Sequence, residues 1–433
     1  MYAWGLEGGT FSGYSITTPY TASLNGGITP TNYFDSGTPF QSGLQPPIGS
    51  AQGLLSDIGN PVALDFPQRK IPRSTIMSFG IQRELPNHIT LDVRYAGNYT
   101  RNLRNFLWLN GTLPLSIGQQ LQQGHFNANL VSQMDAQVPN PYWGVIPQNT
   151  FIGSSPTLPA SILELPWNEF GLVGDYVNPS GKNWYDGLEV KVTKRLYGSA
   201  RGLSFALAYT YSKTMTDDHY LNGWPYQDAK SLYEVAGTDR THIFTLTGVW
   251  DLPMGKGAKF IAPNPSKPLG AIINDWKLNW IFSDATGFPF NPNQGFWYAC
   301  NTFRPKAGPT FGNWLYIPPS GNPMDCYEPV PGGFPVSGLG NLPDQVSFLR
   351  QPYIPNLDLS LEKNIPITES KKLQFRAEAF NFMNTPLFPG PDNNPFDGPP
   401  TRQANGAWVG YGTINFFQQN FPRMIQLTLK FLF

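Results

Sequence analysis

The last ten residues of the chain alternate without a break between two kinds of side chain. Counting back by twos from the end, one side carries only apolar residues, namely Ile425, Leu427, Leu429, Phe431 and Phe433. The positions between them include Gln426, Thr428 and Lys430. Because successive side chains of a strand point to opposite faces, this pattern predicts a strand with one apolar face. Its length is also that of a tilted strand that crosses a bilayer.

Two kinds of protein end in such a strand. One is a soluble β-sandwich whose edge strand closes the chain, and the other is a membrane-spanning β-barrel. In a barrel of the outer membrane, we expect the five apolar residues to form an assembly signal for the barrel-assembly machinery. One strand does not separate the two kinds, because the signal of a single barrel strand is weak.

The composition favours a large β structure. Only 13% of the 433 residues are charged, whereas 14% are aromatic, and the chain has 44 glycines and 43 prolines. Such a composition is typical of many strands joined by turn-rich connections. The net charge is zero and no basic block occurs, so nucleic-acid binding has no electrostatic support. No apolar run is long enough for a transmembrane helix, whereas a barrel needs only alternate apolar residues.

Eight further segments show the same alternation and fall into four neighbouring pairs. Each pair has a modest link, so we expect four hairpins. Together with the C-terminal strand they make nine predicted strands: 75–83 with 89–95, 188–196 with 203–211, 243–250 with 276–282, 357–361 with 373–379, and 424–433.

The connections between the pairs are much longer than those within them. They cover residues 98–183, 213–239, 289–354 and 382–422. Short turns at one end and long loops at the other are typical of outer-membrane barrels, whereas long structureless loops argue against a soluble sandwich. With the C-terminus on the periplasmic side, the long loops are extracellular. We expect residues 1–73, which are rich in Pro and Gly, to be an extracellular loop region and residues 74–433 to form the barrel.

Charged residues occupy the positions opposite the apolar sets. Their number is too large for a packed core, and they suit the wet interior of a barrel whose apolar faces meet outer-membrane lipid. They are Asp92, Arg94, Glu189, Lys191, Arg195, Lys277, Asp358, Glu362, Arg376, Glu378 and Lys430. The predicted fold class is therefore all-β, an antiparallel transmembrane β-barrel segment in the outer membrane of a Gram-negative type of cell.

Several short runs, in order along the chain, resemble the barrel of Oar-like TonB-dependent receptors, many of which carry a carboxypeptidase-regulatory-like domain. The runs are Phe79 to Pro86, Leu91 to Gly97, Tyr185 to Leu188, Tyr209 to Lys213, Asp239 to Phe244, Leu252 to Gly257, Phe375 to Asn384 and Pro422 to Gln426. The resemblance implies a barrel wall that takes part in ligand binding and uptake across the outer membrane.

The chain departs from that family in its extent. Receptors of this kind have a signal peptide, a plug and a barrel of about 22 strands, whereas we expect nine strands here. The N-terminus lacks the basic and apolar regions of a signal peptide. We therefore expect a fragment of a longer receptor, which would reach the TonB complex only through a missing N-terminal part. An isolated set of nine strands leaves edges that lipid does not satisfy.

The sequence offers little for catalysis, and we expect no enzyme activity, no cofactor and no metal. Only Asp217, Asp218 and His219 gather potential metal ligands, without a second Cys or His at ligand spacing. The two cysteines, Cys300 and Cys326, lie in one loop segment. A disulfide between them and two unpaired thiols are both open, because connectivity cannot be deduced from sequence.

The long loops are rich in aromatic residues, which are common anchors in recognition surfaces. We expect them to contact the unknown substrate, and the alternative is that they pack the loops against one another. The candidates are Trp143, Trp167, Trp224, Trp297, Tyr298, Trp314 and Tyr316.

Three functions remain open at this point. The first is the barrel portion of a TonB-dependent receptor, and the second is a surface-exposed binding or adhesion barrel without active transport. The third is a secreted, soluble glycan-binding β-protein, which would place its apolar faces in a dry core.

Overall fold

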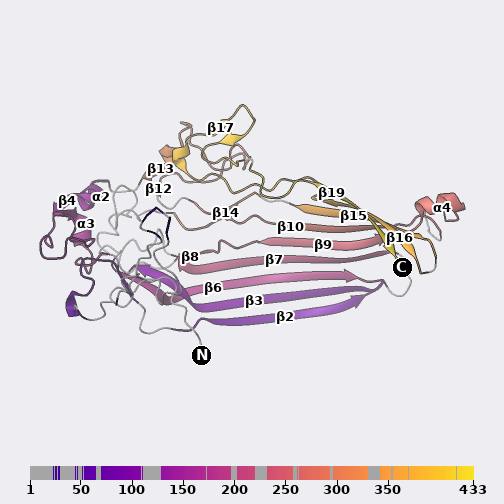
Figure 1. Cartoon of the computed structure of the whole chain (residues 1–433), viewed down its shortest axis with the longest axis horizontal. Coiled ribbons are helices and arrows are strands. Elements are labelled where there is room, and N and C mark those ends of the chain that lie inside the picture. The colour runs from indigo at the N-terminus through magenta and orange to yellow at the C-terminus, as the bar shows by residue number, and fades with distance from the viewer. Residues whose placement is uncertain are drawn as a thin grey trace.

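The computed structural model describes residues 53–64, 70–108, 110, 128–171, 173–196, 202–219, 232–256, 261, 263–292, 296–329, 342–352, 355–368, 370–415 and 417–433, with isolated positions before residue 53. Nine long strands lie side by side in one antiparallel sheet, in the order β19-β16-β15-β10-β9-β7-β6-β3-β2 (Figure 1). The sheet is open, with β2 and β19 at its two edges.

The nine strands are those predicted from the alternation, paired as predicted. They are β2 (Arg73–Leu85) and β3 (Ile89–Trp108), β6 (Val173–Lys194) and β7 (Leu203–His219), β9 (His242–Asp251) and β10 (Trp276–Ala285), β15 (Asn356–Pro366) and β16 (Lys372–Phe380), and β19 (Met424–Leu432). Two short strands are added to the sheet: β1 (Val62–Leu64) lies parallel to β6, and β8 (Leu232–Val235) lies antiparallel to β7.

The register brings all nine apolar sets onto one face, which we call the apolar face. One row of directly paired residues crosses six strands and reads Leu91, Val192, Leu207, Leu246, Phe282 and Leu357. Farther along, Leu361 pairs with Ala377, and Ala377 pairs with Leu427. Phe79 is 72% exposed and Leu427 is 68% exposed, so the apolar face is not the dry core that a soluble sandwich would need.

The opposite face of the sheet, which we call the polar face, carries the predicted charges. They pair across neighbouring strands. Arg94 of β3 binds Glu189 of β6, the Nζ of Lys277 lies 3.2 Å from Asp251, and an Nη of Arg376 lies 3.2 Å from Glu362. Opposite charges on adjacent strands stabilise their pairing, so the charges also help to hold the register.

The two ends of the sheet differ in their connections, as predicted. At one end, which we call the turn end, the strands are joined by residues 86–88, 195–202, 252–275 and 367–371. The third of these contains helix α4 (Lys267–Ile273). At the other end, the loop end, the long connections gather (Figure 1). No helix in the described part of the chain is both long and apolar enough to cross a membrane.

Three strands run farther toward the loop end than predicted. β3 has 20 residues, β6 has 22 and β7 has 17. Their extensions lack a clean alternation, because β-bulges interrupt the period of two. The pairing of β3 with β6 shifts register between Arg101 and Leu107, and that of β7 with β8 shifts between Thr216 and His219. An alternation search finds only the part of a strand that has one apolar face, so the predicted boundaries were too short.

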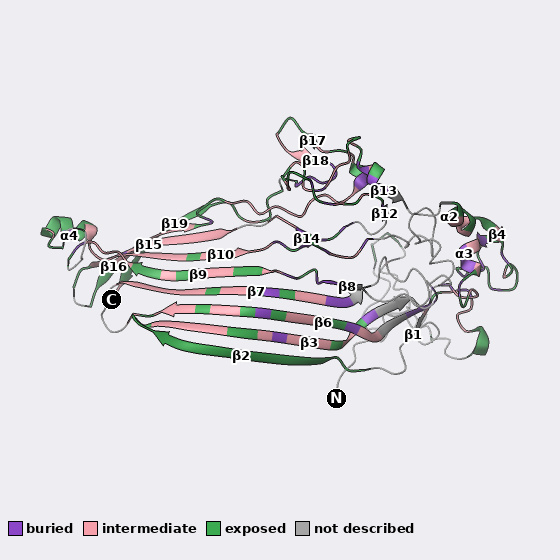
Figure 2. Cartoon of the chain, turned by 180° about the vertical axis from the view of Figure 1, so that it is seen from behind, coloured by how far each residue is buried: buried purple, intermediate pink, exposed green. Residues whose placement is uncertain are grey.

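The loops contain small cores of their own, and most of the buried residues in Figure 2 lie at the loop end. The first loop core joins the hairpin β4 (Gln137–Pro139) and β5 (Thr157–Pro159) to α2 (Ala128–Asp135) and α3 (Ala160–Leu163). Its buried side chains are Ile146, Ile152, Leu158, Ile162 and Leu165.

The second loop core combines segments from two long connections. Its elements are the pairs β11 (Pro289–Phe290) with β14 (Val346–Arg350), β12 (Phe296–Tyr298) with β13 (Tyr327–Pro329) and β17 (Thr401–Arg402) with β18 (Trp408–Val409), and the short helices η3 (Pro323–Cys326) and η5 (Pro395–Asp397). Its buried side chains include Phe290, Phe303, Leu315, Leu349 and Tyr411.

Gly248 gives a test of the sheet. It pairs with Trp280, whose ring covers it so closely that an added Cβ would lie 2.2 Å from a ring carbon. Gly248→Val should displace the indole and lower the free energy of unfolding by about 1–3 kcal/mol, measured by thermal unfolding in detergent. The control is Gly80→Ala, where the nearest atom lies 3.2 Å from the new Cβ. Equal effects of the two changes would contradict this account of the Trp280 contact.

Candidate functional site

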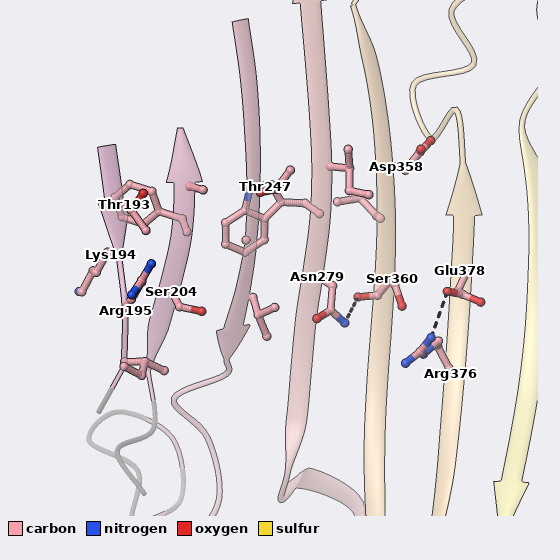
Figure 3. Close-up of a pocket in the computed structure, with 18 of the residues that line it drawn as sticks. Thr193, Lys194, Arg195, Ser204, Thr247, Asn279, Asp358, Ser360, Arg376 and Glu378 are labelled. Atoms are coloured by element: carbon pink, nitrogen blue, oxygen red, sulfur yellow. Dashed lines mark hydrogen bonds and ion pairs between the residues drawn. The ribbon is translucent and has the colours of Figure 1, made fainter. Parts of the chain in front are cut away.

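The polar face is hollowed near the middle of the sheet. An open hollow of about 780 Å³ is lined by β6, β7, β9, β10, β15 and β16 (Figure 3). We call it the central hollow. Its lining mixes cations, anions and apolar side chains, among them Arg195, Val249, Ile281, Asp358, Arg376 and Glu378. It can therefore accept an amphipathic molecule or segment better than a purely charged one.

Arg376 is the cation that is held most firmly in the central hollow. Its Nη atoms lie 3.2 Å from Glu362 and 3.6 Å from Glu378. Glu362 also accepts a hydrogen bond from the amide of Gln374 at 2.9 Å. By contrast, Arg376 Nε and the hydroxyl of Ser360 are buried without a hydrogen bond among the described residues. Neighbouring protein atoms cover both groups, so neither contacts a ligand in the hollow unless its surroundings move.

A second hollow of about 550 Å³ lies on the same face, where β10, β15 and β16 meet their loops. It shares Asp358 and Phe380 with the central hollow. Asp358 is held by the backbone N–H of Asn381, which donates to its Oδ1 at 2.8 Å. The two hollows therefore adjoin at Asp358 and follow one another along the polar face from the loop end toward the turn end, and we call this pair of hollows the route.

A buried ion pair fastens one loop to the sheet beside this route. Asp239 is fully buried, and its carboxylate lies 2.6 Å from an Nη of Arg350 in β14. The same carboxylate accepts the backbone N–H of Thr214 at 2.6 Å, and Arg350 also donates to the carbonyl of Asp239 at 2.9 Å. The neighbouring Arg240 stacks on the ring of Phe288 at 4.1 Å. The run Asp239 to Phe244 therefore positions the loop.

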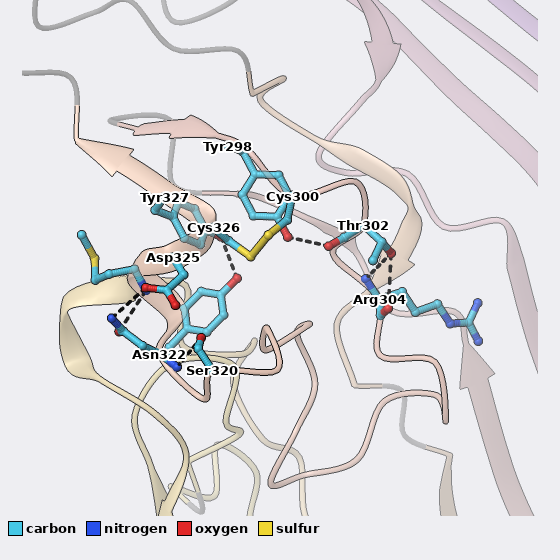
Figure 4. Close-up of a disulfide and its surroundings, with 11 residues drawn as sticks. Tyr298, Cys300, Thr302, Arg304, Ser320, Asn322, Asp325, Cys326 and Tyr327 are labelled. Atoms are coloured by element: carbon cyan, nitrogen blue, oxygen red, sulfur yellow. Dashed lines mark hydrogen bonds between the residues drawn. A yellow bond between two sulfur atoms is a disulfide. The ribbon is translucent and has the colours of Figure 1, made fainter. Parts of the chain in front are cut away.

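The second loop core is closed by the disulfide between Cys300 and Cys326, whose Cα atoms are 5.0 Å apart (Figure 4). Beside it, the hydroxyls of Tyr327 and Tyr411 share a hydrogen bond of 2.6 Å. Burial raises the pKa of both phenols and of the nearby Tyr298. All three rings therefore stay protonated and neutral far above physiological pH.

The predicted loop aromatics have different surroundings. Tyr298 is buried and stacks on Phe303 with ring centroids 3.9 Å apart, and Trp314 and Tyr316 pack on the same core. The side chain of Trp297 and the whole of Trp224 lie outside the described residues. Trp143 and Trp167 are 41% and 44% exposed. The last two are adjacent in sequence to Tyr142 and Asn168, whose side chains are hydrogen-bonded to each other, so both Trp residues belong to the region of the first loop core.

Three other predicted groups can be placed. The C-terminal residues Ile425, Leu427, Leu429, Phe431 and Phe433 are exposed on the edge strand or just after it. Asp217 pairs with Lys182 at 3.0 Å, while the side chains of Asp218 and His219 lie outside the described residues. Within the described ranges, no group of three His, Cys, Asp or Glu residues is placed to hold a metal ion.

Sequence comparison agrees with this architecture. The model of the outer membrane beta barrel domain matches residues 1–426. The chain belongs to this family. A barrel domain of this kind is located in the outer membrane, so the apolar face meets lipid. No curated protein matches the sequence.

The chain is also similar, at low identity, to parts of solved structures of outer-membrane proteins. The chain has a TM-score of 0.36 and 9% identity to the outer membrane transporter YddB from Escherichia coli, covering 87% of this chain and 34% of that one. To the pyoverdine receptor FpvA from Pseudomonas aeruginosa PAO1 it has a TM-score of 0.35 and 11% identity, covering 83% of this chain and 30% of that one. To the FrpB iron transporter from Neisseria meningitidis it has a TM-score of 0.32 and 11% identity, covering 85% of this chain and 32% of that one. The barrel domain thus spans about a third of each of these structures.

The buried ion pair gives a prediction for the barrel domain. Arg350→Met leaves the Asp239 carboxylate buried without its cation, so it should destabilise the attached loop by about 3–5 kcal/mol. We expect limited proteolysis to cut within residues 286–352 much faster than in the unsubstituted protein. Arg94→Gln removes a more exposed ion pair and should leave the cleavage rate nearly unchanged. Equal protection of the Arg350 variant would contradict the anchoring role.

The buried phenols give a second prediction, on alkaline pH. Their pKa is raised in the folded state, so their contribution to stability is complete below the ordinary tyrosine pKa of about 10 and is lost as the pH rises above it. The second loop core should therefore open in alkali, seen as phenolate absorbance together with faster proteolysis of residues 296–329. Tyr411→Phe should remove part of this pH dependence. A pH-independent cleavage rate would rule out the proposed coupling.

Proposed function

We propose that this barrel domain is part of the wall of an Oar-like TonB-dependent receptor, which binds a bulky ligand at the cell surface and takes it up. The observation that carries the proposal is the route along the polar face, where two hollows of about 550 and 780 Å³ share Asp358 and Phe380. A route from the loop end toward the turn end suits passage through a barrel. The order of family-like runs along the sequence supports the finer assignment.

The direction of the two edge strands supports the proposal that further strands complete the barrel. Each of the nine strands is antiparallel to the next, so the edge strands β2 and β19 run in the same direction. Joining them directly would create a parallel seam. An odd number of additional strands would close the sheet with antiparallel pairs throughout. We propose that a longer receptor supplies these strands, a plug and the segment that contacts TonB.

In this proposal the loop end is extracellular and the turn end is periplasmic. Trp143 and Trp167 then lie on the cell surface, where exposed rings can stack on sugar or other flat, partly apolar groups. We propose these two, with Trp224 and Trp297, as ligand contacts. For Tyr298, Trp314 and Tyr316 we propose a different role, which is to keep the second loop core rigid beneath the ligand. The exposed edge residues from Ile425 to Phe433 are the proposed assembly signal.

A binding or adhesion barrel without transport is the second candidate. The two loop cores favour it, because their buried apolar side chains and their disulfide can hold a fixed recognition surface. Such a barrel would not need a continuous polar route. We therefore rank uptake first, because two adjoining hollows follow the polar face. The experiments must show whether this face is wet and whether the cell takes up a nutrient.

Paired cysteine substitutions test whether the polar face lines a water-filled interior. Ile281 and Phe282 are neighbours in β10 that point to the polar and apolar faces, and Ile281 is 55% exposed in the central hollow. Both native cysteines form the disulfide, so an introduced thiol is the only reactive one. In outer membranes, Ile281→Cys should react with a hydrophilic maleimide at least tenfold faster than Phe282→Cys. Equal or faster reaction at Phe282→Cys would contradict a water-filled polar side.

Uptake itself needs a growth assay. Deleting the gene should abolish energy-dependent growth on at least one bulky nutrient in a panel of iron complexes, oligosaccharides and peptides. The unsubstituted gene should restore growth, whereas Asp358→Arg, which puts a bulky cation at the junction of the two hollows, should not. Wild-type growth of the deletion strain on the whole panel, with surface binding retained in the parent, would favour the adhesion barrel.

A further inference from the structure

A third hollow lies at the turn end, away from the route described above. Its volume is about 510 Å³, and it is formed by the turn after β9, helix α4 and the end of β15. We call it the turn-end hollow. Its charged lining consists of Lys256, Lys267 and Lys363 against a single carboxylate, Asp275. Amide groups of Asn264, Asn274 and Asn364 also line it. The lining is thus basic and rich in hydrogen-bond donors, which suits an anion.

Local packing explains why two of the three lysines, Lys256 and Lys363, line the same hollow. The turn after β9 folds back at Gly255, which has a φ of +83°, and an added Cβ there would lie 2.1 Å from Asn274 Oδ1. The same oxygen accepts the backbone N–H of Lys256 at 2.9 Å. On the other side, Lys363 Nζ donates to the carbonyl of Asn274 at 2.8 Å. Asn274 therefore ties the turn and the end of β15 to the end of α4.

The turn-end hollow lies beside the lipid-facing surface of the sheet. Trp276 lies on the apolar face, two residues from Leu278, and its indole N–H donates to the carbonyl of Ile272 in α4 at 2.7 Å. Lys363 pairs with Trp276 across the sheet, and its Nζ is 5.2 Å from the ring centroid. Trp and Lys at the end of a membrane-spanning strand are typical of the membrane interface. Helix α4 is thus attached at the level of the headgroups.

Apolar side chains of α4 remain uncovered beside the basic lining. Leu269 is 44% exposed and Ile272 is 66% exposed, and Ile261 in the same connection is also exposed. Figure 1 shows α4 extending beyond the strand ends at the turn end. A short helix with exposed aliphatic side chains next to lysines suits the boundary between headgroups and acyl chains.

We propose that the turn-end hollow binds the phosphate of an anionic glycerophospholipid in the periplasmic leaflet, with its acyl chains against Leu269 and Ile272. The three lysines supply charge complementarity to the phosphate, and Trp276 sets the depth of the helix. The location in the periplasmic leaflet rests on the proposed function, because that function fixes the turn end as periplasmic. The lipid would anchor this end of the wall and hold α4 against the sheet.

The lipid site can be tested on the full chain purified in detergent. Native mass spectrometry during titration with phosphatidylglycerol should show a bound lipid, and the double variant K256Q/K267Q should bind it roughly tenfold more weakly or worse. The matched control is K371Q/K372Q, which removes two exposed lysines at the same end of the sheet, outside the hollow. An equal loss in both double variants would indicate general charge attraction and overturn the proposal.

Two further titrations, with an uncharged lipid and with inorganic phosphate, test which part of the lipid is recognised. Phosphatidylcholine, which has no net charge, should bind more weakly than phosphatidylglycerol, and equal binding of the two would overturn the charge argument. Inorganic phosphate should not displace the lipid at matched concentration, because it gains nothing from Leu269 and Ile272. Displacement at matched concentration would indicate an ion site and overturn the lipid assignment.

A labelling experiment separates this proposal from the proposed function. Ile272→Cys, with an environment-sensitive dye attached, should emit at shorter wavelength in phosphatidylglycerol bilayers than the same dye at Lys371→Cys. Equal emission at the two positions would overturn insertion of α4. Reaction of Ile272→Cys with a membrane-impermeant maleimide in intact cells would place the turn end outside and overturn both proposals. Protection in intact cells without lipid binding would overturn only the lipid site.

Discussion

The pairing of backbone groups between strands in one fixed register is the constraint on which the rest of this structure depends. A bilayer offers no hydrogen-bond partners, so every membrane-spanning strand must find them in its neighbours. A shift of one residue would turn the side chains of a strand to the other face. The row of paired residues from Leu91 to Leu357 shows that six strands turn their apolar side chains to the same face. Lipid and water then meet different sides of the same sheet.

Ion pairs on the polar face help to fix this register. Arg94 with Glu189 and Arg376 with Glu362 join adjacent strands at positions where a slipped strand would oppose a charge to an apolar residue. On the apolar face, Tyr95 and Tyr99 both donate their hydroxyls to Asp186 in the neighbouring strand, at 2.6 and 2.5 Å. The family-like run around Asp186 thus has a structural reason, which is to satisfy a carboxylate at the lipid boundary with phenol donors.

The sequence could predict the sheet because its signal is local and periodic. Alternation identified all nine long strands, because the pattern of each strand lies within a few consecutive residues. The short links between neighbouring segments identified the four hairpins. Alternation could not predict the ends of β3, β6 and β7, where shifts of register break it. It also missed the anchor of Asp239 and Arg350, which are 111 residues apart and show no spacing rule. Asp239 belongs to one of the family-like runs, but the run does not indicate what Asp239 does. Only the fold shows that its partner is Arg350.

The loop aromatics show why residue type alone does not assign a site. Tyr298 and Trp143 are both rings in long, Pro/Gly-rich connections, and nothing near them in sequence separates their roles. The fold separates them because Tyr298 packs against Phe303, Tyr327 and the disulfide, whereas Trp143 stays at a surface. A loop that carries its own core can hold a recognition surface at fixed geometry, which lowers the entropy lost on binding. The packing around a ring, and not its residue type, therefore decides whether it stabilises a loop core, as Tyr298 does, or stays exposed to contact another molecule, as Trp143 does.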